Sequence, residues 1–94
     1  MTERLPAVDQ VEGCADAAGR ARLVLALPDS VLIADGAALL AVLRHDRAAH
    51  WYVMARLAGL HAVRSPEGDL PPRTVFELGI ARRAVRKVGR GGAQ

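Results

Sequence analysis

Alanine dominates the apolar residues of this chain, and that limits the folds it can form. Eighteen of the 94 residues are Ala, whereas only Trp51, Tyr52 and Phe76 are aromatic. Ala is the best helix former and a poor strand former, so a core of Ala, Leu and Val favours closely packed helices over a sheet. A chain of this length makes one domain with a modest core. The sequence therefore predicts a mainly α domain of three to four helices.

The longest apolar stretch is expected to be helical. It is the apolar-rich run 31–43, and Asp29 or Ser30 is expected to cap its start. The polar residues 44–47 end or expose that helix, and a second helix is expected from residue 48. Asp35-Gly36 interrupts the apolar run, so a bend or a new helix start is expected near residue 36. Whether 36–58 forms one helix or two stays open at this point.

One segment leaves room for a small amount of sheet. The run 20–27 is short, apolar and closed by Pro28, which suits a strand, although periodicity alone does not separate a strand from another buried segment. A short two-stranded β element that pairs 22–27 with 60–64 is the expectation.

The two ends of the chain are expected to be less ordered than the middle. Residues 1–19 are acidic and contain Pro and Gly, so they are expected to form a flexible arm, with a short helix near 7–17 as the alternative. The single helical domain is then 20–94, and it finishes with a basic helix and a short disordered tail.

Positive charge gathers in the last quarter of the chain. Residues 71–94 hold six Arg or Lys against one Glu, a net charge of +5, whereas residues 1–70 have a net charge of −2. The ratio of twelve Arg to one Lys is typical of a GC-rich genome, as in actinobacteria or their phages, and explains why Arg is frequent. It does not explain why the charge is local. Local positive charge on a helix is typical of nucleic-acid binding.

Several kinds of protein are excluded or disfavoured. Cys14 is the only cysteine, so no intrachain disulfide or thiolate metal cluster can form. The first residues lack the basic-then-apolar order of a signal peptide, and the longest uninterrupted apolar run, 37–43, is too short to cross a membrane. A cytoplasmic protein is expected.

The sequence shows no pattern typical of an enzyme or a metal site. His45 and His50 are five residues apart and point in different directions on a helix, so neither they nor Asp46 and His61 form a set of converging ligands. No Ser-His-Asp order, phosphate-binding Gly loop or pair of carboxylates at catalytic spacing occurs. We expect no catalytic residues, no cofactor, no metal and no small-molecule ligand.

Residues 71–90 carry the motif that bears on function. Leu78-Gly79-Ile80 is an apolar-Gly-apolar turn, and Val85 and Val88 follow at the spacing that packs a second helix on the first. This stretch resembles the helix-turn-helix of small bacterial and phage DNA-binding proteins. The resemblance implies a recognition helix whose outward positions are Arg82, Arg83, Arg86, Lys87 and Arg90.

The same apolar residues also suit one continuous helix over about 72–88. Gly79 would then cost about 1 kcal/mol inside the helix. The buried stripe would be Val75, Leu78, Ala81 or Arg82, Val85 and Val88. Arg83, Arg86, Lys87 and Arg90 would then form a solvated face near the negative end of the helix dipole. In either case a cationic helix face can contact phosphate.

The leading hypothesis is a DNA-binding transcriptional regulator of bacterial or phage origin that binds duplex DNA through its basic C-terminal helix. Residues 31–58 are expected to supply the core and a homodimer surface, with Trp51-Tyr52 in the core. The alternative is a helical adaptor, or a phage structural or host-takeover protein, whose basic end docks on an acidic protein surface without binding DNA.

Overall fold

A computed structural model describes residues 6–91, and the mainly α prediction is confirmed: these residues form helices joined by turns and loops, without a strand. The described residues form five helices, more than the three to four expected: α1 (Pro6–Gly13), α2 (Ala17–Leu25), α3 (Asp29–Val42), α4 (Arg47–His61) and α5 (Pro72–Gly89). The stretch 36–58 is therefore divided between two helices, α3 and α4.

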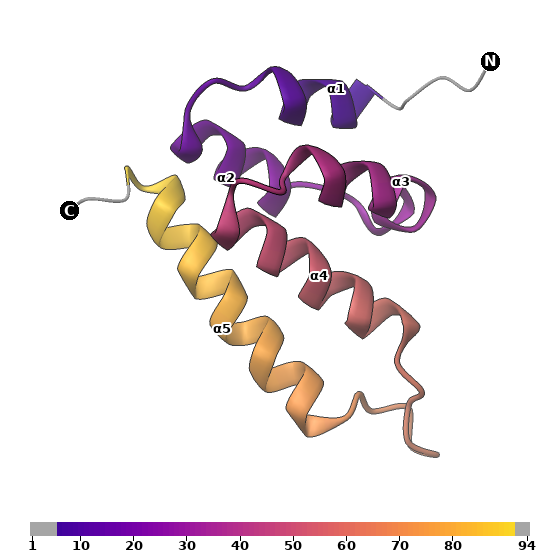
Figure 1. The fold of residues 1–94 in the computed structure, drawn as a ribbon. Coiled ribbons are helices and arrows are strands. Elements are labelled where there is room, and N and C mark those ends of the chain that lie inside the picture. Colours follow the sequence, from indigo (N-terminus) through magenta and orange to yellow (C-terminus); the bar gives the residue numbers. More distant parts are fainter. Residues whose placement is uncertain (1–5, 92–94) are drawn as a thin grey trace.

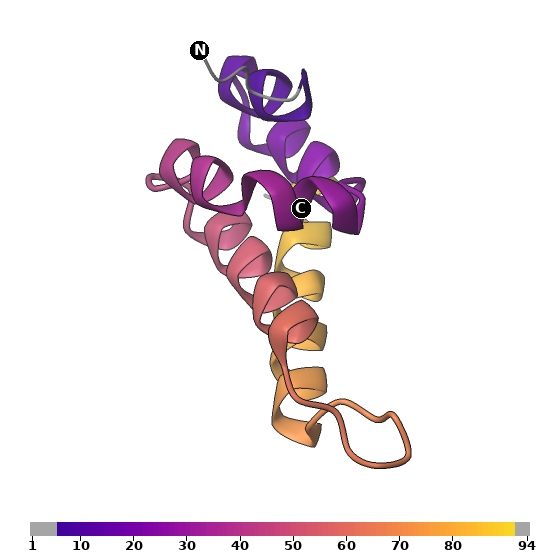
Figure 2. The ribbon, with the colours of Figure 1, turned by 90° about the vertical axis from the view of Figure 1, so that its right-hand side faces the viewer.

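The helices form a flat molecule with extents of 43 × 43 × 18 Å. Helices α1, α2 and α3 gather at one end, and α4 and α5 extend from them as an antiparallel pair (Figures 1 and 2). The long helix α5 packs on α4 and α2, while α3 packs on α4 and α1. Every helix contributes to one core. Its buried apolar residues are Val8, Val11, Ala21, Val24, Leu27, Leu32, Leu39, Leu43, Ala49, Tyr52, Val53, Ala81 and Val85.

The expected β element is wrong, because residues 22–25 belong to α2 and residues 60–61 to the end of α4. The buried residues of the first segment, Ala21, Val24 and Leu27, recur every third position, which is a helical and not a strand period. Asp16 starts α2 by accepting a hydrogen bond from the Gly19 backbone N at 3.0 Å.

Residues 6–19 are part of the domain, contrary to the expected arm over 1–19. The helical alternative is the one present, as α1, and its Val8 and Val11 are buried against the rest of the core. Val8 and Val11 form an apolar i, i+3 pair, which is enough to dock a short helix despite its acidic neighbours. Residues 1–5 and 92–94, which include the expected tail, lie outside the described residues.

The bend expected near residue 36 is confirmed. Asp35 has non-helical angles (φ −125°, ψ 23°) inside α3. At the next residue α3 passes close to α4: a Cβ added to Gly36 would lie only 3.0 Å from Leu57 Cδ1. The expected side-chain cap is absent, because α3 starts after Pro28 without one, and Asp29 instead pairs with Arg56.

The loop between α4 and α5 brings the two helices into an antiparallel pair (Figure 1). The Gly68 backbone N donates to Ser65 O at 2.8 Å, and Gly68 has a φ of +89°, which favours glycine. Pro71 and Pro72 then open α5, since proline is tolerated in the first turn of a helix. This loop places the C-terminal half of α5 beside the start of α4.

Candidate nucleic-acid interface

Helix α5 runs from Pro72 to Gly89 without a break. Gly79 has no positive φ; within residues 6–91 only Gly68 and Gly91 do. The turn at Gly79 that a helix-turn-helix would need is therefore absent, and the continuous-helix alternative is the one the chain adopts. At 1.5 Å per residue, α5 is about 27 Å long.

The inner face of α5 packs on α4 and α2. Ala81 and Val85 are fully buried, and Leu78 and Val88 are half-buried beside them, as the continuous helix predicts. Val75 departs from the prediction: 53% of it is exposed. The helix turns this position away from α4.

A single arginine of α2 fixes the C-terminal end of α5. Arg22 Nη1 donates a hydrogen bond to the backbone oxygen of Gly89 at 2.8 Å. A carbonyl in the last turn of a helix has no partner within the helix, so this bond satisfies one that would otherwise need water. A Cβ on Gly89 would lie 3.4 Å from Arg22 Cγ, which shows how closely α2 and α5 approach here.

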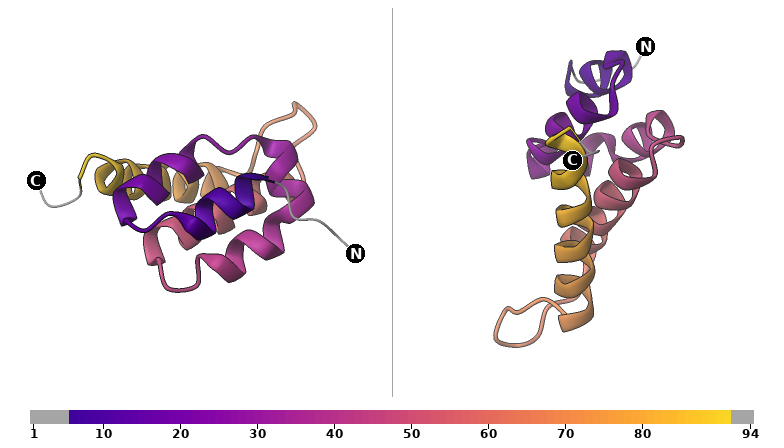
Figure 3. Two further views of the ribbon diagram at one scale, coloured as in Figure 1. Left: turned by 90° about the horizontal axis from the view of Figure 1, so that it is seen from above. Right: turned by 90° about the vertical axis from the view of Figure 1, so that its left-hand side faces the viewer.

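Four cations occupy the outer face of the last two turns of α5. Their spacing places them on the side opposite Val85. They are Arg83, Arg86, Lys87 and Arg90, and all four are exposed. Viewed from the left-hand side of Figure 1, α5 lies in front of α4, and no other element of the described chain crosses in front of it (Figure 3, right). We call these four residues the basic face.

The four side chains of the basic face have no carboxylate partner among the described residues. Among the described residues, none of its four side chains makes a hydrogen bond or an ion pair. Three arginines elsewhere do pair with acids: Arg20 with Asp46, Arg56 with Asp29, and Arg73 with Glu77. The positive charge of the basic face therefore stays available to an outside partner.

Arg82 is separated from the other four predicted residues. It is only partly exposed and lines a cavity between α2, α4 and α5. One residue along a helix is a rotation of about 100°, so Arg82 and Arg83 point to different sides of α5. The continuous-helix alternative allowed Arg82 a place in the buried stripe, whereas the helix-turn-helix resemblance placed it with the outward cations; the packing of α2 and α4 on α5 decides its position.

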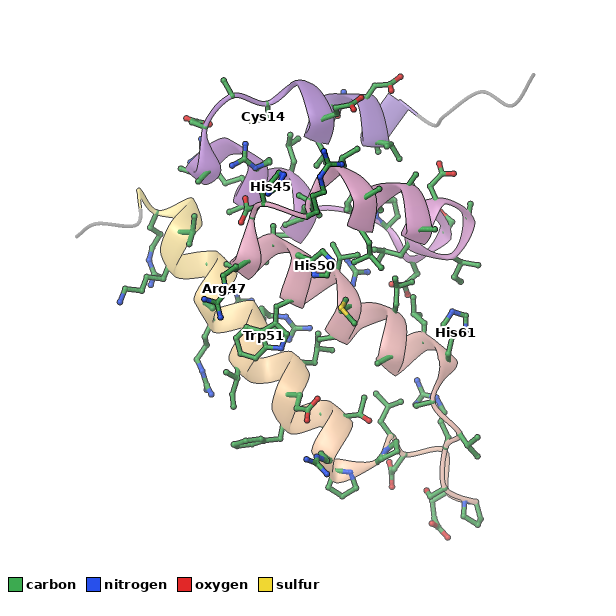
Figure 4. The ribbon with its side chains drawn as sticks, viewed as in Figure 1. Cys14, His45, Arg47, His50, Trp51 and His61 are labelled. Atoms are coloured by element: carbon green, nitrogen blue, oxygen red, sulfur yellow. The ribbon has the colours of Figure 1, made fainter. Side chains whose placement is uncertain are left out.

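One exposed cation of α4 was not singled out from the sequence. Arg47 lies at the start of α4, one turn before Trp51, and its side chain is drawn in front of α5 in the view of Figure 4. The sequence offered no local signal for it, since its position depends on the antiparallel pairing of α4 with α5.

The expected burial of Trp51-Tyr52 is correct for Tyr52, which is 3% exposed, but wrong for Trp51, which is 41% exposed.

The other chemically notable residues lie apart. His45, His50 and His61 are spread along the α3–α4 turn and α4 (Figure 4). No group of three or more His, Cys, Asp or Glu residues in positions 6–91 is arranged to hold a metal ion. Asp46 caps α4, accepting from the Ala49 backbone N at 3.2 Å, and Cys14 Sγ contacts Asp16 Oδ1 at 3.6 Å.

Within the described range, no helix is long and apolar enough to cross a membrane. Comparison with known protein families, with curated proteins and with solved structures finds no match to this chain. The proposed function therefore rests on the basic face of α5.

Proposed function

We propose that this chain is a small DNA-binding protein, a transcriptional regulator of bacterial or phage origin acting in the cytoplasm, which binds duplex DNA through the basic face of α5. One observation carries the proposal: four exposed cations lie together on one side of α5 and at its C-terminal cap, and no described side chain neutralises them. Abundant Arg codons would scatter such residues; they would not group them unpaired on one face.

The mechanism is charge neutralisation on the phosphate backbone. Each Lys or Arg that meets a phosphate releases condensed counterions, which makes binding strongly dependent on salt. An α-helix with its side chains is about 10–12 Å wide and enters the major groove, where Arg can bond guanine through O6 and N7. Because the basic face holds only Arg and Lys, most contacts are to phosphate, and selectivity among sequences is moderate.

The proposal includes a homodimer formed through residues 31–58. Trp51, Met54 and Ala58 follow an i, i+3, i+7 spacing on the outer side of α4 and are all exposed. Trp51 and Met54 are 41% and 51% exposed, which is unusual for large apolar side chains in adjacent turns. A dimer paired through this side of α4 carries two basic faces. Binding of both faces to two half-sites on one duplex is tighter than binding of a single face.

The test is fluorescence anisotropy of a labelled random-sequence duplex, titrated with protein at low salt. Wild type binds, and the double variant Arg83→Gln/Lys87→Gln binds about tenfold more weakly or worse, since it loses two charge-assisted contacts. The matched control is Arg44→Gln/Arg73→Gln, which removes the same charge from exposed positions outside the basic face. Absence of binding by the wild type at every salt concentration refutes the proposal.

A second candidate function is a helical adaptor that docks on an acidic protein. It is favoured by two exposed apolar side chains in the first turns of α5, Val75 and Phe76, which are 53% and 66% exposed. Apolar side chains next to cations suit a protein surface as well as a nucleic acid. Failure of the duplex to bind, together with capture of an acidic amphipathic peptide by the wild type but not by Phe76→Ser, assigns the adaptor function.

A further inference from the structure

A cavity borders α5 beside the basic face, on the side of the helix that carries Leu78 and Arg82. It is about 420 Å³ in volume, within the range of small-molecule sites, and is open to solvent. Its apolar walls come from three helices. They are Leu25 from α2, Leu27 just after it, Leu60 from α4 and Leu78 from α5.

Three arginines line this cavity against a single carboxylate, that of Asp29. Arg56 is held in place: its Nη1 donates to Leu27 O at 2.6 Å, its Nη2 pairs with Asp29, and its guanidinium carbon lies 5.8 Å from the centre of the Tyr52 ring. Arg64 donates to Gly68 O at 2.7 Å. The lining therefore has a surplus of positive charge.

Arg82 is the cation of this cavity without a partner. It makes no hydrogen bond or ion pair with any residue in positions 6–91, although it is partly buried beside Leu78. A guanidinium has five N–H donors in a planar fork that fits a carboxylate with two parallel bonds. A partly desolvated arginine of this kind gains most from an anion that also brings apolar surface.

We infer that the cavity between α2, α4 and α5 binds a monocarboxylate with an apolar chain, whose carboxylate pairs with Arg82 and whose chain covers the leucine walls. A neutral apolar molecule would leave Arg82 without its counter-charge. A small inorganic anion would leave the leucines exposed to water. Only a ligand with a carboxylate and an apolar chain both pairs with Arg82 and covers the leucines.

Octanoate titrated into the isolated protein tests this site without any nucleic acid. Isothermal titration calorimetry gives the affinity, and backbone amide NMR shifts give the location. We expect saturable binding with the largest shifts at Gly59, Leu60 and Leu78. Arg82→Gln weakens octanoate binding about tenfold or more, because it removes a charge-assisted bidentate contact. Arg83→Gln, one position along on the exposed side, changes the affinity by no more than about twofold.

Octan-1-ol serves as the uncharged probe, and it should bind wild type and Arg82→Gln equally. Arg82 has no intramolecular partner among the described residues, so its replacement should leave the fold intact; circular dichroism checks this. The inference is overturned if octanoate does not saturate, if both variants weaken it equally, or if the amide shifts fall on residues 83–90 alone.

Discussion

At the scale of single residues, two aspartates begin neighbouring helices with the same bond but with different surroundings. Asp16 accepts from the Gly19 backbone N, and Asp46 accepts from the Ala49 backbone N. Only Asp46 also pairs with an arginine, accepting from Arg20 Nε at 2.8 Å, and both partners of that pair are mostly buried. Asp16 is therefore a helix cap without an arginine partner, whereas Asp46 is a helix cap and also the acid of an ion pair.

Asn is as good a helix cap as Asp, so Asp46→Asn removes the charge and keeps the cap. We expect a loss of about 1–2 kcal/mol in the free energy of unfolding, measured with urea, because a partly buried hydrogen bond between charged groups becomes weaker. Asp46→Ala should lose about 1 kcal/mol more, the cost of an absent cap. The control Asp16→Asn should change stability by less than about 0.5 kcal/mol. Equal losses for the two Asn variants would show that the contact with Arg20 contributes nothing.

Residue-scale features that depend on local sequence were predictable, and those that depend on distant packing were not. The turn at Ser65 to Asp69 and the helix start at Pro72 follow from turn and proline chemistry alone. The partial burial of Arg82 depends on α2, which lies about sixty residues earlier in the chain. The apolar spacing left Ala81 or Arg82 as the buried position, and only the packed helices show that Ala81 is fully buried and Arg82 partly buried.

At the scale of elements, residues 71–90 are compatible in sequence with a helix that bends at Gly79 and with a straight helix. Their apolar spacing fits a bent and a straight helix equally well, and a glycine inside a helix costs only about 1 kcal/mol, less than the packing of one buried valine supplies. Tertiary contacts with α4 and α2 therefore decide in favour of the straight helix. Segment 20–27 was uncertain for a similar reason, since it is too short for its period to be read reliably.

Replacing Gly79 tests the straight helix directly. A Cβ at this position meets nothing within 4 Å, and the backbone is helical, so Gly79→Ala should raise the free energy of unfolding by about 0.5–1 kcal/mol. Gly68→Ala is the contrasting control, because Gly68 has a φ of +89° and the substitution should lower stability by about 1 kcal/mol or more. A loss of stability in Gly79→Ala would mean that α5 bends there after all.

At the scale of the whole molecule, the proposed dimer uses the outer side of α4. Met54→Glu should weaken self-association about tenfold or more, measured as the concentration dependence of mass in light scattering, since it places a charge in an apolar contact. Val63→Glu is the matched control: this residue is 88% exposed and lies outside 31–58. A wild type that stays monomeric at every concentration removes the dimer from the proposal.

The central claim is that the basic face, and not the net charge of the molecule, binds DNA. The dependence of duplex affinity on salt concentration tests this claim. Four phosphate contacts predict a slope of log K against log salt of about −3.6 for one protomer, or about −7 for two bound together. Arg83→Gln/Lys87→Gln should halve the slope, while Arg44→Gln/Arg73→Gln, with the same net charge, should leave it unchanged. Equal slopes for the two variants would contradict the account.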